Sequence, residues 1–216
     1  MGRPPNTDPA VTRRRILEAA VDLFGEYGRE GAAIREVARR SDVSMSTVLH
    51  HFGSKQGLFD ACVAAMFDEL ARQRDQQIAA IAGVPSPREA VDRVVRQSFR
   101  FARRHRRLLR VILCESVTTG HVPADVRQEV MIPTVEAAAD LVSRLCGHPP
   151  TMARLLVLSV NHLITRFVLT DPEELLATVT HGEARSDSEA WLYQTLEDHL
   201  ARSAAVLIFG SDSPST

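Results

Sequence analysis

The sequence has little of several residues and patterns that mark large classes of protein. Of its 216 residues, three are cysteine and one is tryptophan, and Lys55 is the single lysine. The cysteines (Cys62, Cys114 and Cys146) lack paired spacing, which indicates reduced thiols rather than a disulfide framework. No apolar run approaches the ~20 residues of a membrane span. The first ten residues lack the apolar core of a signal peptide, so we expect a cytoplasmic protein without a membrane partner.

The sequence also lacks the motifs that mark common enzymes and metal sites. We find no glycine-rich phosphate loop, no internal repeat and no alternating strand pattern. Cys114 and Ser116 have no nucleophile signature around them, and Glu115 alone makes no acid–base pair. The eight histidines are scattered without the spacing of a zinc site. We therefore expect no catalytic residue, no metal and no cofactor, and we predict that the protein is not an enzyme.

The charge distribution has the sign expected of a nucleic-acid-binding N-terminal part. Residues 1–55 hold nine Lys/Arg and seven Asp/Glu, whereas residues 56–216 hold 17 and 20, within a net charge of −1. A dense arginine stretch from Arg93 to Arg110 has two readings. It could contact an acidic ligand or DNA phosphates, or it could be a solvated helix face paired with Glu89, Asp92 and neighbouring acids. We favour the second reading.

Helical periodicity runs through the whole chain and predicts an all-α fold. Asp8-Pro9 suits a helix start, and Gly28 or Gly31 would end that helix. Its apolar residues fall on one face: Ile16, Ala19, Ala20, Leu23 and Phe24. Pro133 is expected to kink or split a later helix, and a short helix begins at Pro172. The other long helices are predicted at about residues 55–82, 86–105, 106–117, 123–146, 151–170 and 188–209.

The segment 32–56, AAIREVARRSDVSMSTVLHHFGSKQ, carries the strongest functional signal. It predicts two short helices joined by the turn Asp42-Val43-Ser44, with Ser44 as the N-cap of the second helix. Val43, Val48 and Phe52 would then face inward. The outward residues of the second helix would be Met45, Ser46, Thr47 and His50. This layout is a helix-turn-helix, whose second helix enters the DNA major groove.

From Thr12 to Phe59 the sequence resembles the TetR family of bacterial transcriptional regulators. The matching residues are Val37-Ala38, Val43-Ser44, Thr47, His51-Phe52, Ser54-Lys55 and Leu58. The family's usual Thr, turn Gly, small Gly and Tyr are replaced by Ala33, Asp42, Ser46 and Leu49. Aspartate tolerates the left-handed conformation, so Asp42 can still turn. Leu49 lacks the hydroxyl that typically reaches a DNA phosphate in the family, and Ala33 lacks a capping hydroxyl.

The resemblance implies two domains, a DNA-binding helix-turn-helix domain at residues 1–54 and a ligand-binding and dimerisation domain at residues 55–216. It implies a repressor that a small effector releases from a palindromic double-stranded DNA operator. Thr47 and its neighbours would touch bases or backbone, and other side chains of the motif would touch phosphates. The full set of DNA-contact candidates is Arg35, Ser44, Met45, Ser46, Thr47, His50, His51 and Lys55.

The larger domain would bind the effector and a second copy of the chain. The resemblance implies a homodimer through the helices Thr151–Thr170 and Ser188–Phe209. The first of these is apolar nearly all round, which by itself indicates burial on several sides. His162 and Arg166, one turn apart, could face a ligand or a partner subunit, although satisfied structural roles are favoured. The pocket candidates, mainly apolar, are Met66, Leu70, Phe99, Cys114, Val117, Met131, Val135, His162, Arg166 and Phe167.

The sequence also allows a function of a different class. The chain could be a helical scaffold or an enzyme that carries a degenerate helix-turn-helix. Ala33 and Leu49 support that alternative, because both lack a hydroxyl that would help to bind phosphate. Binding to DNA upstream of the chain's own gene, followed through a salt titration, would separate the two classes.

Overall fold

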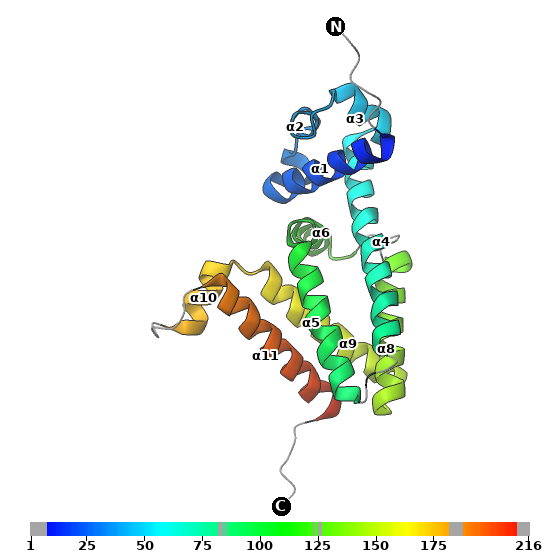
Figure 1. Cartoon of the computed structure of the whole chain (residues 1–216), viewed down its shortest axis with the longest axis vertical. Coiled ribbons are helices and arrows are strands. Elements are labelled where there is room, and N and C mark those ends of the chain that lie inside the picture. Colours follow the sequence, from blue (N-terminus) through cyan, green and yellow to red (C-terminus); the bar gives the residue numbers. More distant parts are fainter. Residues whose placement is uncertain are drawn as a thin grey trace, which may run out of the picture. The chain divides into compact units, whose positions relative to one another are not determined.

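The computed structural model describes residues 8–81, 84, 86–122, 124, 127–181 and 188–210, with only the backbone described at 77–81, 114–119 and 130. These residues form helices and no strands, so the predicted all-α fold is confirmed for the described chain (Figure 1). The chain divides into two compact units. The first comprises Met1–Leu70 and Arg107–Val122, and the second comprises Ala71–Arg106 and Pro123–Thr216. The domain boundary after residue 54 stays a prediction.

The first unit begins with three helices, α1 (Pro9–Gly31), α2 (Ile34–Arg40) and α3 (Met45–Phe52). Asp8 caps α1, because its carboxylate accepts a hydrogen bond from the N–H of Ala10 at 2.9 Å. Gly28 has a φ of 70°, which breaks the last turn of α1 as its sequence predicts. The rest of this unit comes from α4 (Lys55–Ile81) up to Leu70 and from α6 (Arg106–Thr119) from Arg107 onward.

The core of the first unit forms on the predicted inner face of α1. Ile16, Leu23 and Phe24 are almost completely buried there, together with Val48 of α3 and Leu58 of α4. The ring of Phe24 meets that of Phe59 edge to face, with 5.2 Å between centroids. A side chain from α3 thus enters a core whose other members come from helices before and after it. This packing anchors α3 through one face only.

The second unit is built from α5 (Pro87–Arg104), α8 (Ile132–Cys146), α9 (Pro150–Leu169), α10 (Pro172–Thr180) and α11 (Glu189–Phe209). In Figure 1, α11 runs beside α5 and α9, and α9 beside α8, as their contacts require. The hydroxyls of Ser86 and Ser188 cap α5 and α11. The predicted split at Pro133 is confirmed, because a π-helical turn (η1, Arg127–Met131) ends there and α8 carries Pro133 in its first turn.

Part of the arginine stretch is paired as the favoured reading predicts, because Arg93 and Arg96 of α5 bind Glu89 and Asp92. Arg96 donates to Asp92 at 2.8 Å and to Asp198 of α11 at 2.6 Å, and these bonds raise the pKa of its guanidinium. Arg100 binds Glu197 with N–O distances of 2.7 to 3.0 Å, although the Glu197 carboxylate is almost fully buried. Two of these ion pairs, Arg96–Asp198 and Arg100–Glu197, join α5 to α11.

Candidate nucleic-acid interface

The turn between α2 and α3 is held in place from α1. Asp42 has a φ of 54°, the left-handed conformation predicted for this position. Arg15 of α1 donates to the carbonyl oxygen of Ser41, and its guanidinium lies 3.6 Å from the Asp42 carboxylate. Ser41 is buried, and its hydroxyl donates to the carbonyl of Val37 at 2.7 Å. The turn therefore sets the direction of α3 through contacts with both α1 and α2.

Ser44 is the predicted N-cap of α3, and its hydroxyl is fully occupied. Its oxygen accepts a hydrogen bond from the N–H of Thr47 at 3.1 Å. It also lies 2.7 Å from the hydroxyl of Ser46 and 2.8 Å from that of Thr47. A hydroxyl can donate one hydrogen bond and accept two, so these partners saturate it. Ser44 thus starts α3, and a phosphate contact through its hydroxyl would have to displace one of these bonds.

The side chains of α3 divide between the core and solvent in the predicted sense. Val48 has no exposed surface, and Val43 and Phe52 are half-buried. On the other side Met45 is 49% exposed, and Ser46 and His50 are also exposed, whereas Thr47, Leu49 and His51 are half-buried. α3 therefore offers its N-terminal residues to solvent. That these residues contact DNA stays a prediction.

The basic residues of α2 differ in how far carboxylates neutralise them. Arg39 and Arg40 both bind Glu36, at 2.6 and 3.2 Å, and Arg40 also binds Glu26 at 3.0 Å. Hydrogen bonds from Arg39, then from Arg40, lower the pKa of Glu36 to about 2. Arg35 is exposed, and the structure shows no carboxylate beside it in the part of the chain that it describes. Arg35 therefore presents the least compensated positive charge of α2.

Lys55, the single lysine, links the end of α1 to the start of α4. Its Nζ atom donates to the carbonyl oxygen of Glu30 at 2.8 Å and lies 3.8 Å from the Glu30 carboxylate. One third of its side chain, 33%, is exposed. The amine thus satisfies a carbonyl at the C-terminal end of α1. Lys55 has a structural contact beside the phosphate contact predicted for it.

Gly57 is a structural requirement of this unit that the sequence analysis did not single out. It lies in the first turn of α4, where the N–H of Gly57 donates to the capping hydroxyl of Ser54 at 3.0 Å. A Cβ atom at this position would lie 2.2 Å from the carbonyl oxygen of Phe52, the last residue of α3. Backbone cannot move aside as a side chain can, so only glycine lets α4 start this close to α3.

The predicted effector-binding residues lie in both units. Met66 is buried in the first unit, where the half-buried Leu70 is the last residue before the division inside α4. In the second unit Phe99 and Val135 are buried and Phe167 is half-buried. Met131 of η1 is 39% exposed, and His162 and Arg166 of α9 are exposed. The side chains of Cys114 and Val117 lie outside the described residues. This ligand set stays a prediction.

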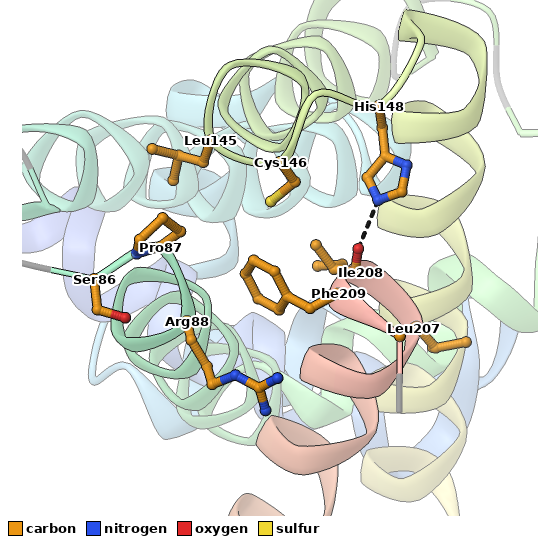
Figure 2. A pocket seen from close by; sticks show the side chains of 10 residues that line it. Ser86, Pro87, Arg88, Leu145, Cys146, His148, Leu207, Ile208 and Phe209 are labelled. Carbon is orange, nitrogen blue, oxygen red and sulfur yellow. Dashed lines mark hydrogen bonds between the residues drawn. The ribbon is translucent and has the colours of Figure 1, made fainter. Parts of the chain in front are cut away.

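A pocket in the second unit lies elsewhere and contains none of those residues. It has a volume of about 790 Å³ and lies where the start of α5 meets the ends of α8 and α11 (Figure 2). The Arg88 guanidinium lies 5.4 Å from the centre of the Phe209 ring, and Nε2 of His148 lies 2.6 Å from the carbonyl oxygen of Ile208. Its lining residues are Ser86, Pro87, Arg88, Leu145, Cys146, His148, Leu207, Ile208, Phe209 and Gly210.

The pocket contains two side chains of a type that can act in catalysis, Cys146 and His148. Partial burial raises the pKa of the Cys146 thiol, which lowers its reactivity at neutral pH. The ring of His148 is oriented by the backbone carbonyl of Ile208. Among the residues that the structure describes, those of the pocket included, no three His, Cys, Asp or Glu side chains gather into a metal-binding group.

Comparisons with known proteins agree with the geometry of the first unit. Residues 16–62 match the family described as bacterial regulatory proteins, tetR family. The HTH-type transcriptional regulator BetI of Rhizobium meliloti is 34% identical over 90 residues, which are 42% of this chain and 43% of that protein. The HTH-type transcriptional regulatory protein RaaS of Mycobacterium tuberculosis is 45% identical over 56 residues, 26% of each chain. These matches thus span less than half of either curated relative.

The fold as a whole also has solved counterparts. The crystal structure of a putative TetR-family transcriptional regulator from Mesorhizobium loti superposes with a TM-score of 0.66. The match covers 94% of this chain and 97% of that one at 17% sequence identity, so it shows a shared fold. The resemblance drawn from residues 12–59 is therefore confirmed, and the all-α arrangement of an N-terminal helix-turn-helix domain with a helical C-terminal domain is shared with these regulators.

Proposed function

We propose that this chain, which carries the helix-turn-helix domain of the TetR family, is a DNA-binding transcriptional regulator that acts as a cytoplasmic repressor. The observation that supports this most strongly is the placement of α3. Val48 anchors the helix in the core, and the turn before it is tied to Arg15. Met45, Ser46 and His50 are thereby left exposed at and after the N-terminus of the helix. In helix-turn-helix proteins these positions meet the base edges of the major groove.

We propose that the regulator is a homodimer formed through α9 and α11, the helices predicted at Thr151–Thr170 and Ser188–Phe209. Met152 and Leu155 of α9 are 47% and 54% exposed, and Val206 and Leu207 of α11 are 51% and 41% exposed. A second copy would cover these apolar side chains in a two-fold arrangement. The two recognition helices would then read half-sites ~34–36 Å apart in a palindromic operator.

α9 has a further property that a subunit interface would explain. Among the described helices, it is the one long and apolar enough to cross a membrane by length and composition, although the sequence suggested no such run. Only 22% of its most apolar window is buried within the single chain. Core helices of proteins without a membrane segment pass the same test. We propose that a second copy of the chain, and not lipid, covers the remaining apolar surface.

We further propose that a small, mainly apolar effector controls the repressor. In the second unit, the buried side chains of Phe99 and Val135 would supply apolar contacts, and His162 and Arg166 would supply polar ones. An effector releases the operator only if it binds the released state more tightly than the DNA-bound state. A ligand screen by thermal shift would find such a molecule, because a ligand that binds the folded state raises the melting temperature.

The alternative function, a scaffold or enzyme with a degenerate helix-turn-helix, has one structural observation in its favour. Ala33 precedes α2 without any side-chain hydrogen bond to cap the helix. The first N–H groups of α2 are therefore not satisfied by a side chain, as they would be with Thr at this position. The loss concerns one helix end, whereas the capped start of α3 is intact. We therefore favour the regulator.

The deciding experiment measures DNA binding by the full-length protein. Fluorescence anisotropy would follow its binding to duplexes from upstream of its own gene and to random-sequence duplexes, over a range of salt concentrations. We expect tighter binding to one upstream duplex and a linear fall of log affinity with log salt, with a slope of about 0.9 per phosphate contact. Equal, weak binding to every duplex would instead support the alternative.

Two matched variants show which surface binds. Arg35→Ala removes an exposed charge of α2 that has no carboxylate partner in the described structure, and it should weaken binding to all duplexes. Arg144→Ala removes the same charge from α8 in the second unit, where it pairs with Asp140 at 2.8 Å, and should leave binding unchanged. Thr47→Ala should instead change the preference among duplexes. Equal effects of the two arginine variants would count against α2 and α3 as the interface.

A further inference from the structure

Met45 is a large apolar side chain that belongs to no core. It is the first residue of α3 and is 49% exposed, whereas Val48, one turn later, is completely buried. Within the described part of the first unit, Met45 and Tyr27 are the large apolar side chains with most exposed surface. Exposed methionine at a helix start contributes nothing to capping, because it has no donor and only a weak acceptor. Neither the core nor the cap of α3 therefore accounts for this side chain.

The residues on either side of Met45 make hydrogen bonds with one another through their hydroxyls. The hydroxyls of Ser46 and Thr47 both lie within hydrogen-bond distance of the Ser44 hydroxyl, at 2.7 and 2.8 Å. Together they form a small network of hydroxyls that fixes the first turn of α3. Beside this network Met45 presents only methylene groups, a thioether and a methyl group. At the leading end of the helix, one apolar side chain stands beside hydroxyls that already have partners.

The major groove offers one apolar feature for such a side chain. Every base edge there carries hydrogen-bond donors or acceptors, and thymine alone among the four bases adds a methyl group, at C5. Methionine cannot read the donors and acceptors with any strength, and it has no charge with which to hold a phosphate. It is flexible and polarizable, so it can fit against a methyl group at variable depth.

From these observations we infer that Met45 determines operator specificity by contacting the C5 methyl group of one thymine in each half-site. This inference rests on the proposed function, because it names the base that α3 would select. Burial of one methyl group against a hydrocarbon surface corresponds to about a fourfold change in Kd. In a palindromic operator bound by a dimer, loss of both methyl groups should weaken binding by about fifteenfold.

The test removes the methyl group and nothing else. The full-length protein first selects its tightest duplex from a random-sequence pool. Each thymine of that duplex is then replaced in turn, at symmetric positions of both half-sites, by deoxyuridine, which keeps every hydrogen-bonding group. Anisotropy at fixed salt gives Kd for the wild type, Met45→Ala, Met45→Leu and Ser46→Ala. Thermal melting checks that each variant is folded.

We expect one symmetric thymine pair whose replacement weakens the wild type about fifteenfold. The same replacement should leave Met45→Ala unaffected and should still weaken Met45→Leu, which keeps an apolar side chain, and Ser46→Ala. Two results would overturn the inference while leaving a DNA-binding regulator in place. One is tight, selective binding with no thymine sensitive to methyl loss. The other is full sensitivity retained by Met45→Ala. Failure to select any duplex would instead count against the proposed function itself.

Discussion

Lys55→Ala should change both DNA binding and stability, and the two effects have separate structural causes. The Nζ atom of Lys55 donates to the carbonyl oxygen of Glu30 at 2.8 Å and is 3.8 Å from the Glu30 carboxylate. The side chain is 33% exposed, so the amine can also reach a phosphate placed beside it. Its structural contact joins the end of α1 to the first residue of α4. Its proposed functional contact is with the DNA backbone.

The two effects have different expected sizes. The proposed dimer carries two copies of Lys55, so loss of both proposed phosphate contacts should lower the slope of log affinity against log salt by about 1.8. Operator and random DNA should be weakened alike, because a phosphate contact carries no sequence information. A hydrogen bond from a charged donor contributes about 1.5–3 kcal/mol to folding. Water can replace it at this partly exposed amine, so we expect a loss of about 1 kcal/mol.

Anisotropy over a salt series gives the slope, and urea unfolding gives the stability. Glu30→Gln is the matched control, because it removes the carboxylate beside Lys55 but keeps the carbonyl that accepts its hydrogen bond. We expect this control to leave the salt slope unchanged. If Lys55→Ala lowers stability while its slope equals that of the wild type, Lys55 serves only to join α1 and α4. The prediction that Lys55 contacts a DNA phosphate would then be wrong.

Three further predictions concern the interface, the recognition helix and acid stability. Leu155→Glu should convert the proposed dimer of about 48 kDa, twice the 23.9 kDa of one chain, into a folded monomer. Leu155 is 54% exposed in the single chain, so a charge there would lie in the proposed interface without disturbing the core. Unchanged sedimentation would contradict the α9 interface. Leu49→Tyr should tighten operator binding through a hydrogen bond to phosphate, with little change in melting temperature. If the tyrosine instead overpacks the core, the variant should lose about 1–3 kcal/mol in stability without tighter binding. The pKa of Glu36 is lowered from 4.5 to about 2, so its contribution to stability is complete above pH 4.5 and is lost as pH falls toward 2. Glu36→Gln should remove that part of the acid dependence in urea unfolding, and an unchanged pH profile would refute it.

Local signals in the sequence predicted most helix ends and the inner face of α1. Asp8, Ser44 and Ser188 each cap the helix that follows them, and a capping bond joins a side chain to a backbone N–H only two or three residues further along the chain. The left-handed turn at Asp42 and the interruption before Pro133 follow from the same kind of short-range constraint. The helix-turn-helix could be recognised for this reason, because its geometry depends on a continuous segment of chain.

Features that depend on distant residues could not be predicted in this way. The bond between Arg100 and Glu197 joins residues 97 positions apart, and no pattern in the sequence selects that carboxylate among the others. The pocket of Figure 2 is formed where three helix ends meet, so its members share no motif. The contact of Lys55 with Glu30 likewise depends on how α1 and α4 pack, and the sequence predicted a phosphate contact for this lysine but not its bond to Glu30.

Gly57 has a consequence for how genetic data on this protein should be interpreted. The carbonyl of Phe52 leaves no room for a side chain at this position, so every substitution must push the end of α3 away from the start of α4. In a mutational scan scored by repression of a reporter gene, Gly57 would therefore score as poorly as a residue that touches the operator. Repression would be lost whichever amino acid replaces Gly57 and whichever operator is used. At a residue that contacts a base, the loss would depend on the replacing amino acid and on the operator sequence. Comparing scans on two operators would separate the two kinds of position without any purified protein.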